Sequence, residues 1–513
     1  MKLILNGNIS PYYVQTLCLI FFPGSKFSES EEVTDEVPVL TVDLTEDETS
    51  LSAWAQIKLG DSVSTGQCTE PRKKKKTYVD LSKVVVGKAI FEAGTNFFAH
   101  TPSWGILTGI RPSKIARKIF DEGYDPVHIR KILRNEYLLS TKKASLLTNI
   151  AVNEARIIDA LPKDSCSLYI SIPFCPTRCA YCSFISFATK RLLSMIPEYL
   201  ERLLVDIDRV FEVIRARGLR LSTVYIGGGT PTTLSASQLD MLLSRIDANT
   251  DVSLLEEYSL EAGRPDTIDA EKMRVIKEHG VTRISINPQT LNDTVLEGIG
   301  RRHTAEDFFK AYEIAKNAGI RCINTDLIAG LPGEGYRSFS RSVDEVLALR
   351  PENFTVHTFC VKKAADVAKG GAGVYSAPGG DVLKSVDYSQ LRAKSAGYIP
   401  YYLYKQKNTV GNLENVGFSL PEYEGKYNIY IMEELHTIFA VGAGSVTKMV
   451  DREHGMIERY FMPKYPYEYL SVENSENIRR EYFAKINDFY ERLDRLRAEK
   501  GNKSGDISNI ITE

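Results

Sequence analysis

The spacing of hydrophobic residues between residues 165 and 360 changes repeatedly from every second position to every third or fourth position. The first spacing predicts β-strands and the second predicts amphipathic helices. Strands are predicted at about 166–173, 221–226, 257–262, 282–287, 321–328 and 353–359. Helices are predicted at about 192–216, 235–247, 266–279, 292–299, 304–318 and 336–349. Such alternation gives a parallel sheet, and six units are too few to close an eight-stranded barrel. We therefore expect an α/β fold built on a partial, TIM-like (βα)6 barrel.

Capping signals support these helices. Residues 304–307, Thr-Ala-Glu-Asp, have the form of a capping box. Gly280 and Gly319 lie where helix C-terminal caps are expected.

The regions on either side of the barrel have mixed patterns. Strands are predicted at 1–5, 39–45 and 53–59, one helix at 79–98, and helices across 99–160. Beyond residue 365, strands are predicted at 398–404 and 427–432, followed by a long charged helix at about 475–499 and a frayed end from residue 500. The expected domains are an N-terminal α/β domain (1–98), a helical segment (99–164), the barrel (165–365) and a mixed, helix-rich C-terminal region (366–513).

Composition places the chain among soluble globular proteins. Hydrophobic residues make up 43% and charged residues 25% of the 513 residues, and the formal net charge is -2. A charge near zero gives no reason to expect nucleic acid as a partner. The sequence has neither an apolar run of the roughly 18 residues that a spanning helix needs nor the layout of a signal peptide. We expect a cytoplasmic protein without a membrane span.

The first predicted barrel strand is followed by three cysteines, Cys175, Cys179 and Cys182, spaced C-x3-C-x2-C. Thiolates gathered on one loop select zinc, copper(I) or an iron–sulfur cluster. A structural zinc site would need a fourth ligand, and no local candidate follows. A cluster held by three thiolates leaves one iron open for another ligand. A zinc knuckle or unligated buried thiols are the alternative interpretations. The other cysteines are scattered singly and are expected to be small buried hydrophobes.

The second predicted strand ends in Gly227-Gly228-Gly229-Thr230-Pro231-Thr232. Glycines allow close approach of a ligand to the backbone, whose N–H groups can meet a carboxylate or a ribose. Together with the cysteine loop, this segment resembles the radical S-adenosylmethionine (SAM) enzymes. Further segments are similar to the oxygen-independent coproporphyrinogen III oxidase family, and two of them to its HemZ-type branch. They are 169–175, 289, 301–304, 326–333, 397–407 and 411–417.

The resemblance implies one [4Fe-4S] cluster and SAM as cofactors, with the cluster held by Cys175, Cys179 and Cys182. The residues that correspond to the family's SAM contacts are Tyr169, Tyr181, Gly228, Gly229, Thr230, Glu261, Gln289, Arg301 and Asp326. In this comparison the Glu261 carboxylate takes the methionine amino group or a hydroxyl. Asp326 suits the ribose, and Arg301 can pair with the methionine carboxylate through two hydrogen bonds.

The implied reaction is oxidative decarboxylation of coproporphyrinogen III to protoporphyrinogen IX. An electron from the cluster cleaves SAM, the resulting 5′-deoxyadenosyl radical takes hydrogen from a propionate, and loss of an electron and CO2 leaves a vinyl group. Flavodoxin or ferredoxin is the expected kind of electron donor. Four propionates on the substrate call for cations, for which the candidates are Lys362, Lys363, Lys405 and Lys407.

The sequence departs from the family at several positions. Family members usually carry His where Ser171 stands, and a further cysteine where Phe184 stands. The related haem-chaperone branch has a His-Asn-x-Tyr-Trp motif, whereas this chain has Tyr427-Asn428-Ile429-Tyr430. Methyl transfer or ring opening on another tetrapyrrole, and haem trafficking without decarboxylation, are the alternative functions.

Overall fold

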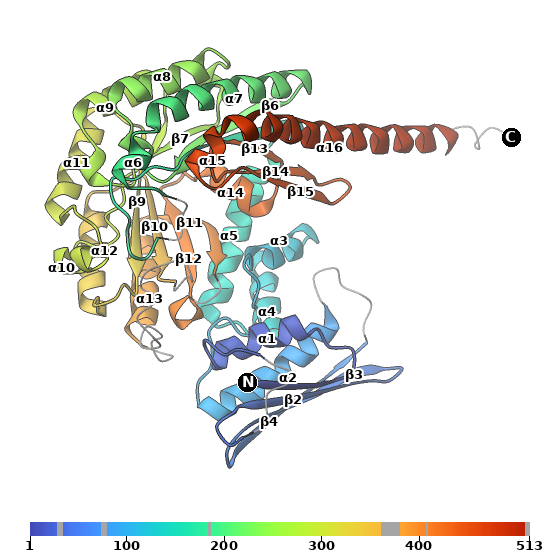
Figure 1. Cartoon of the computed structure of the whole chain (residues 1–513). Coiled ribbons are helices and arrows are strands. Elements are labelled where there is room, and N and C mark those ends of the chain that lie inside the picture. The colour runs from blue at the N-terminus through green and yellow to red at the C-terminus, as the bar shows by residue number, and fades with distance from the viewer. Residues whose placement is uncertain (28–33, 73–79, 183–185, 361–379, 407–408, 508–513) are drawn as a thin grey trace. The chain divides into compact units, whose positions relative to one another are not determined.

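A computed structural model describes residues 1–27, 34–72, 80–182, 186–360, 380–406 and 409–507 (Figure 1). The chain divides into two compact units. Unit 1 comprises residues 1–157, 328–340 and 355–419, and unit 2 comprises residues 158–327, 341–354 and 420–513. The boundary passes through two strands of one sheet. The domain limits expected at residues 98, 164 and 365 stay predictions.

The barrel strands form in the predicted places. They are β5 (Ser165–Ile172), β6 (Arg220–Gly228), β7 (Glu257–Glu261), β8 (Arg283–Ser285), β9 (Cys322–Ala329) and β10 (Asn353–Thr358). Within the described residues these strands belong to an eleven-stranded sheet of order β11-β12-β10-β9-β8-β7-β6-β5-β13-β14-β15. From β5 to β9 the neighbours pair in parallel. The expected open, partial barrel is therefore confirmed.

Helices follow the barrel strands, as the sequence predicted. They are α6 (Lys190–Leu193), α7 (Ile196–Ala216), α8 (Ala236–Asp247), α9 (Ala270–Glu278), α10 (Asp293–Gly298), α11 (Ala305–Asn317) and α12 (Tyr336–Ala348). Figure 1 shows α7, α8, α9 and α11 along the outer side of the strands. The capping box is present at Thr304, whose hydroxyl accepts from the Asp307 N–H. Gly280 and Gly319 have φ of 72° and 75°, as expected of C-terminal caps.

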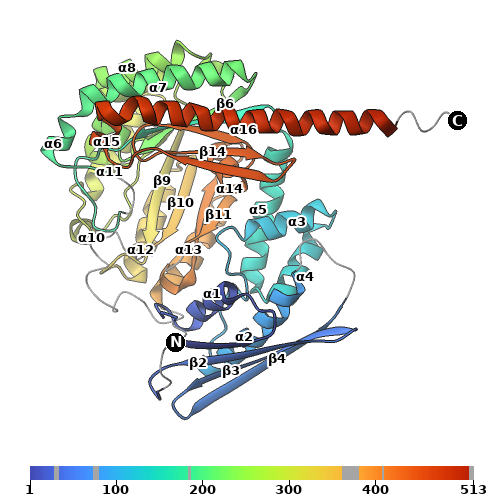
Figure 2. The same ribbon diagram turned by 45° about the vertical axis from the view of Figure 1, so that its right-hand side comes forward.

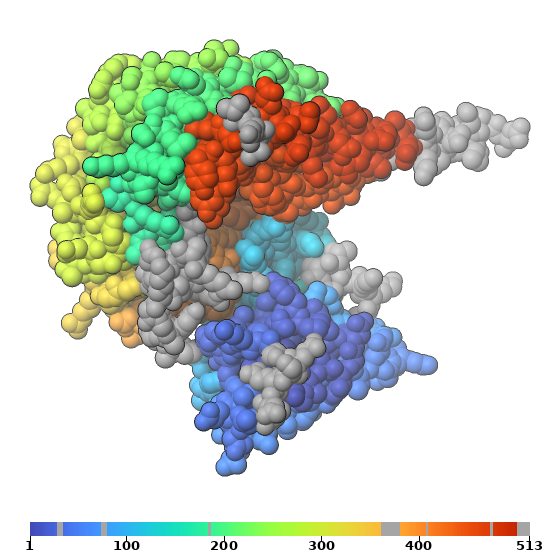
Figure 3. Space-filling view, viewed as in Figure 1, coloured from blue at the N-terminus to red at the C-terminus, as the bar shows by residue number. Residues whose placement is uncertain are grey.

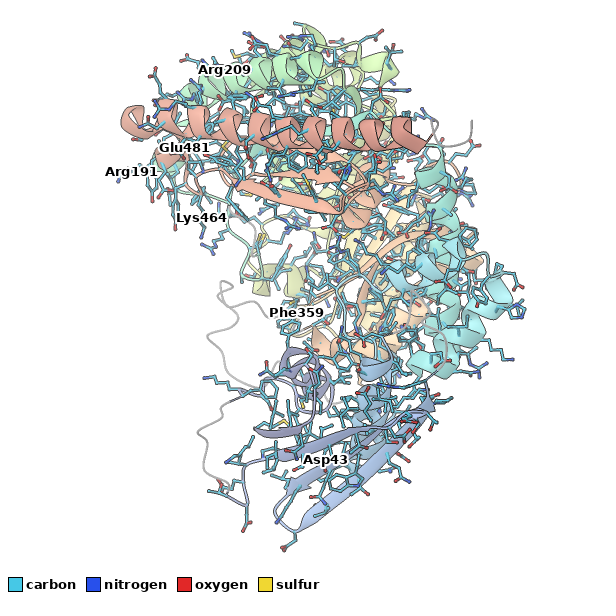
Figure 4. The ribbon with its side chains drawn as sticks, turned by 90° about the vertical axis from the view of Figure 1, so that its right-hand side faces the viewer. Asp43, Arg191, Arg209, Phe359, Lys464 and Glu481 are labelled. Atoms are coloured by element: carbon cyan, nitrogen blue, oxygen red, sulfur yellow. The ribbon has the colours of Figure 1, made fainter. Side chains whose placement is uncertain are left out.

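The C-terminal segment adds strands that the sequence analysis missed. Strand β13 (Thr437–Val441) pairs in parallel with β5, and β14 (Val446–Asp451) and β15 (Met456–Phe461) continue the sheet. Helix α15 (Pro466–Leu470) precedes α16 (Val472–Ile507), which packs on β14 and β15 (Figure 2). Figure 3 shows α16 crossing one face of its unit, and Figure 4 shows it beside α7, with Glu481 on one helix and Arg209 on the other. The helix ends at Ile507, and the expected fraying from residue 500 stays a prediction.

The prediction of a strand at 427–432 was also wrong, because these residues form α14 (Lys426–Glu433). Their alternating aromatic and β-branched residues favour a strand locally, but tertiary contacts decide the outcome. The Glu257 carboxylate accepts from the Lys426 N–H at 2.7 Å, which caps the helix, and the Tyr430 hydroxyl donates to Glu256 at 2.8 Å. The helix ends at Glu433, and the next residue, Glu434, caps it with a left-handed φ of 54°.

Unit 1 contains a four-stranded sheet of order β1-β2-β3-β4 among the residues described there. Its strands are β1 (Lys2–Asn6), β2 (Val39–Glu46), β3 (Ser50–Leu59) and β4 (Ser62–Pro71). The helices of this unit outside the barrel are α1 (Pro11–Phe21), α2 (Leu81–Phe98), α3 (Ser113–Asp121), α4 (Pro126–Tyr137), α5 (Thr141–Asp159) and α13 (Asp381–Ser395). Strands β11 (Ile399–Lys405) and β12 (Glu414–Ser419) form an antiparallel pair. The expectation of one helix in residues 1–98 was wrong, because α1 and α2 both form.

In the part of the chain that the structure describes, none of the helices combines the length and the apolar character needed to cross a bilayer.

Candidate active site

The loop after β5 carries the three predicted thiol ligands, all in unit 2. Cys175 and Cys179 are buried and Cys182 is half-buried. The Cys175 N–H donates to the Phe187 carbonyl at 3.1 Å, and the Cys175 Sγ lies 3.3 Å from the Thr230 hydroxyl. Burial raises the pKa of the Cys175 thiol, and the nearby Cys182 and Cys179 thiols act in the same direction. The Cys182 N–H donates to the Cys179 carbonyl at 3.1 Å, so these two residues share one turn of the loop.

The donor set suits an iron–sulfur cluster. Within the described ranges, no three His, Cys, Asp or Glu side chains are already arranged as a metal cage. The residues present nevertheless fit this cofactor, because three thiols share one loop at the carboxyl edge of a parallel sheet and buried guanidinium groups lie beside them. Thiolate sulfur at that edge is the ligand type that such clusters use.

The glycine segment at the end of β6 packs directly on the cysteine loop. The Gly229 and Thr230 N–H groups donate to the Ile172 and Phe174 carbonyls, each at 2.8 Å. A Cβ on Gly229 would lie 2.5 Å from the Phe174 carbonyl oxygen, and Gly228 has φ of 109°. These two bonds hold the end of β6 against the cysteine loop. The SAM contacts expected of Gly228, Gly229 and Thr230 stay predictions.

Glu261 lies at the carboxyl end of β7, beside the glycines. Its Oε1 accepts from the Tyr225 hydroxyl at 2.6 Å. Burial raises the pKa of the Glu261 carboxyl to about 7, and the charge of Asp326 acts in the same direction. A carboxyl with this pKa changes charge near neutral pH, which is a frequent property of functional sites.

Gln289 and Asp326 lie together at the next strand ends. The Gln289 N–H donates to the Asp326 carbonyl at 3.0 Å, and Gln289 has a left-handed φ of 70°. Among the described residues, no hydrogen-bond partner reaches the buried Gln289 Oε1. Asp326 accepts from the Asn324 amide at 2.7 Å. An unsatisfied amide oxygen in a buried position is costly, so a bound polar ligand would satisfy it.

Arg301 is buried and bonded to the cysteine loop. Its Nε and Nη2 donate to the Tyr181 hydroxyl at 3.3 and 2.9 Å, and its Nη1 donates to the Gly263 and Asn287 carbonyls at 3.0 and 3.2 Å. Most of its donors are thereby engaged by the protein. The predicted two-bond contact between Arg301 and a ligand carboxylate would therefore require some of these bonds to be exchanged.

A second arginine in contact with the loop, Arg264, was missed by the sequence analysis. It is 3% exposed and its Nη1 lies 3.6 Å from the Cys179 Sγ. The available signal was an Arg-Pro-Asp run three residues after Glu261, at a strand end where functional residues gather.

Three tyrosines stack inside unit 2. The Tyr225 ring centroid lies 4.4 Å from that of Tyr427 on α14 and 6.0 Å from that of Tyr169 on β5, and both pairs are nearly parallel. Tyr427 is 5% exposed. Because Tyr225 also binds Glu261, the stack connects α14 to the carboxylate.

Of the four predicted substrate lysines, the structure describes one, Lys405. Lys362, Lys363 and Lys407, like Phe184, lie outside the described residues. Lys405 belongs to unit 1, is 3% exposed and lies 4.9 Å from the Trp104 ring centroid. Burial lowers the pKa of the Lys405 ammonium to about 7. A substrate role for the lysines stays a prediction.

Comparison with known proteins relates this site to a family. A family profile described as the Radical SAM superfamily matches residues 169–346. A Bacillus subtilis protein named oxygen-independent coproporphyrinogen-III oxidase-like protein HemZ is 40% identical over 372 residues, which are 72% of this chain and 74% of that protein. The haem chaperone HemW of Bacillus subtilis is 37% identical over 197 residues, which cover 38% of this chain and 51% of HemW.

A solved structure agrees with the fold. Coproporphyrinogen III oxidase (HemN) from Escherichia coli matches with a TM-score of 0.50 and 20% identity, over 64% of this chain and 72% of that one. The cysteine loop, the glycine segment and the strand-end residues all lie in unit 2, and the HemZ match extends over most of both proteins. The chain therefore belongs to the radical SAM oxygen-independent coproporphyrinogen III oxidase family, in its HemZ-type branch.

Proposed function

We propose that this protein oxidatively decarboxylates coproporphyrinogen III to protoporphyrinogen IX. The observation that carries the proposal is the match to HemZ, 40% identical over 74% of a relative named as a coproporphyrinogen oxidase-like protein. The assembly of thiols, Glu261, Gln289 and Asp326 at one sheet edge supports radical chemistry on a substrate of this kind.

The radical SAM family uses a [4Fe-4S] cluster and SAM. In this chain Cys175, Cys179 and Cys182 would hold the cluster. When bound, the cluster supplies the electron that cleaves SAM, so that a carbon radical can take hydrogen from an unactivated position. Each propionate would then lose a hydrogen atom to the 5′-deoxyadenosyl radical, one electron to a separate one-electron acceptor, and CO2, and so become a vinyl group. Two propionates per substrate therefore consume two SAM molecules. A flavodoxin or ferredoxin is the proposed electron donor.

We assign roles to the chain's own residues from their positions. Glu261 accepts the ammonium of SAM, because it is a buried carboxyl with a titratable charge. The ribose hydroxyls bind to Gln289 and Asp326. The buried Oε1 of Gln289 can accept a hydrogen bond from one of them, because no described residue donates to it. Arg301 keeps Tyr181 in place and offers positive charge to the SAM carboxylate. Tyr169, which stacks on Tyr225, forms part of the wall of the SAM site.

SAM affinity should rise with pH between pH 6 and 7.5. The pKa of the Glu261 carboxyl is about 7, so below this pH the group is mostly neutral and cannot pair with an ammonium. The ionised fraction increases about eightfold over this interval, and the affinity should follow it. Isothermal titration of SAM against the anaerobically reconstituted protein measures this slope. In Glu261→Gln the slope should disappear, and an unchanged slope in that variant would exclude Glu261 as its source.

Gly229→Ala should lower turnover by about 100-fold, which is the scale of effect expected from a misplacement of about 1 Å in a site. The added Cβ would lie 2.5 Å from the Phe174 carbonyl oxygen, so β6 must move away from the cysteine loop. Gly298→Ala is the matched control, because a Cβ there meets no heavy atom of the described chain within 4 Å. Release of 5′-deoxyadenosine per unit time is the measurement. Equal rates of 5′-deoxyadenosine release in Gly229→Ala and Gly298→Ala would contradict the close contact between Gly229 and Phe174.

A haem-trafficking function is the second candidate, since HemW is 37% identical over 38% of this chain. The position of Tyr427 argues against it. Tyr427 stands where the haem-chaperone motif begins with His, and its ring is buried against Tyr225.

The deciding experiment is an anaerobic assay of the reconstituted protein with reductant, SAM and coproporphyrinogen III, followed by mass spectrometry. Protoporphyrinogen IX with about two equivalents of 5′-deoxyadenosine is the expected result, since two propionates react. 5′-Deoxyadenosine without loss of CO2 would overturn the substrate assignment and favour methyl transfer or ring opening on another tetrapyrrole. Stoichiometric haem binding without turnover would favour the chaperone.

A further inference from the structure

Arg264 lies between β7 and α9, against the loop that carries the thiols. Its Nη1 donates to the Cys179 Sγ at 3.6 Å and to the Thr177 carbonyl at 3.4 Å. Its Nε and Nη2 donate to the two carboxylate oxygens of Asp266, each at 2.9 Å. The carboxylate fixes the plane of the guanidinium, so that the remaining edge is directed at the cysteine loop.

The local charges favour an added electron near Cys179. The Arg264 side chain is 3% exposed, whereas that of Asp266 is 25% exposed, so water screens the negative partner more than the positive one. Arg301, also buried, interacts electrostatically with Cys179 as well. Hydrogen bonds to the sulfur ligands and buried positive charge both raise the reduction potential of an iron–sulfur cluster.

We infer that Arg264, anchored by Asp266, is a positioning residue that holds the cysteine loop and raises the reduction potential of the cluster bound there. Arg264 contacts a ligand sulfur, whereas the proposed SAM contacts Glu261, Gln289 and Asp326 lie at the strand ends. The effect is therefore on the ease of reducing the cluster. This inference rests on the proposed [4Fe-4S] cluster. It holds whichever tetrapyrrole is the substrate.

The test is an anaerobic redox titration of the reconstituted full-length protein, without SAM or substrate, monitored by electron paramagnetic resonance. Arg264→Met should shift the midpoint potential to more negative values, because a positive charge and a hydrogen bond to sulfur are lost. Asp266→Asn should shift it in the opposite direction, because a negative charge is lost while one amide oxygen still accepts from Arg264. Arg264→Lys, which keeps the charge without the planar fork, should give an intermediate value.

Midpoint potentials that shift in opposite directions in Arg264→Met and Asp266→Asn would show an electrostatic role. A purely structural role would shift both potentials in the same direction. Arg274→Met is the control, because Arg274 is an exposed residue of α9 that pairs with Glu278. The cluster in this variant should have the midpoint potential of the parent protein. Iron content and circular dichroism report folding of each variant. If Arg264→Met does not retain the cluster, Arg264→Lys and Asp266→Asn still decide the question. Unchanged potentials, or shifts of the same sign in Arg264→Met and Asp266→Asn, would overturn the inference.

Discussion

Cys175→Ala should leave the protein folded but without its iron–sulfur cluster, and SAM cleavage should fall to background. Cys175 is one of three thiols on the loop, so its loss leaves two ligands, which are too few to retain a cluster with an open iron. Iron per chain and visible absorption after anaerobic reconstitution measure the loss. The effect on activity should be complete, because SAM cleavage needs the electron that the cluster supplies.

The matched control is Cys166→Ala. Cys166 is a fully buried thiol near the beginning of β5, the strand that leads into the cysteine loop, and it lies outside that loop. This variant should keep the iron content and activity of the parent protein. A Cys175→Ala protein that binds as much iron as Cys166→Ala would refute the ligand assignment.

Glu414→Ala should destabilise unit 1 by about 3–5 kcal/mol, the range expected when one partner of a buried ion pair is removed. Glu414 is fully buried and accepts from Lys143 at 2.5 Å, from Trp104 at 2.7 Å and from Gln390 at 2.6 Å. The Lys143 ammonium holds the pKa of the Glu414 carboxyl below its usual range despite burial. Without Glu414, the buried Lys143 ammonium loses its nearer counter-charge and keeps only the Asp387 carboxylate, at 3.6 Å. Thermal unfolding followed by circular dichroism measures the change.

Two comparisons make the Glu414 result specific. The double substitution Lys143→Met with Glu414→Leu removes both charges and should restore most of the stability. Asp121→Ala removes the carboxylate of the Arg117–Asp121 pair on α3, which is 52% exposed, and should change the free energy of unfolding by about 0.5 kcal/mol or less. If Glu414→Ala were as mild as Asp121→Ala, the buried cluster would have no role in stability.

The barrel and the thiol loop could be predicted because local patterns determine them. Alternating periods fix the order of strands and helices, and parallel strands place their carboxyl ends at one edge. Cys175, Glu261, Gln289 and Asp326 are far apart in sequence but lie at that edge, so the topology alone brings them together.

Other features depend on contacts that no local pattern reveals. Residues 427–432 alternate like a strand, but the carboxylates of Glu256 and Glu257 hold them as α14. Arg264 was not predicted as a site residue, because only the packing of the loop brings it to Cys179. Arg301 likewise donates to the Tyr181 hydroxyl and to backbone carbonyls, and these bonds form only in the folded chain.

The position of β13 has a consequence for how the chain can be shortened. Strand β13 gives β5 a second parallel neighbour, so the strand that leads into the thiol loop is interior to the sheet. A protein cut before residue 437 would keep all three cysteines yet present β5 as an open edge. Open edges pair with other molecules, so such a fragment should aggregate before it can bind iron. Strand β13 therefore protects the edge of β5 from pairing with other molecules. The barrel should be produced only together with this C-terminal segment.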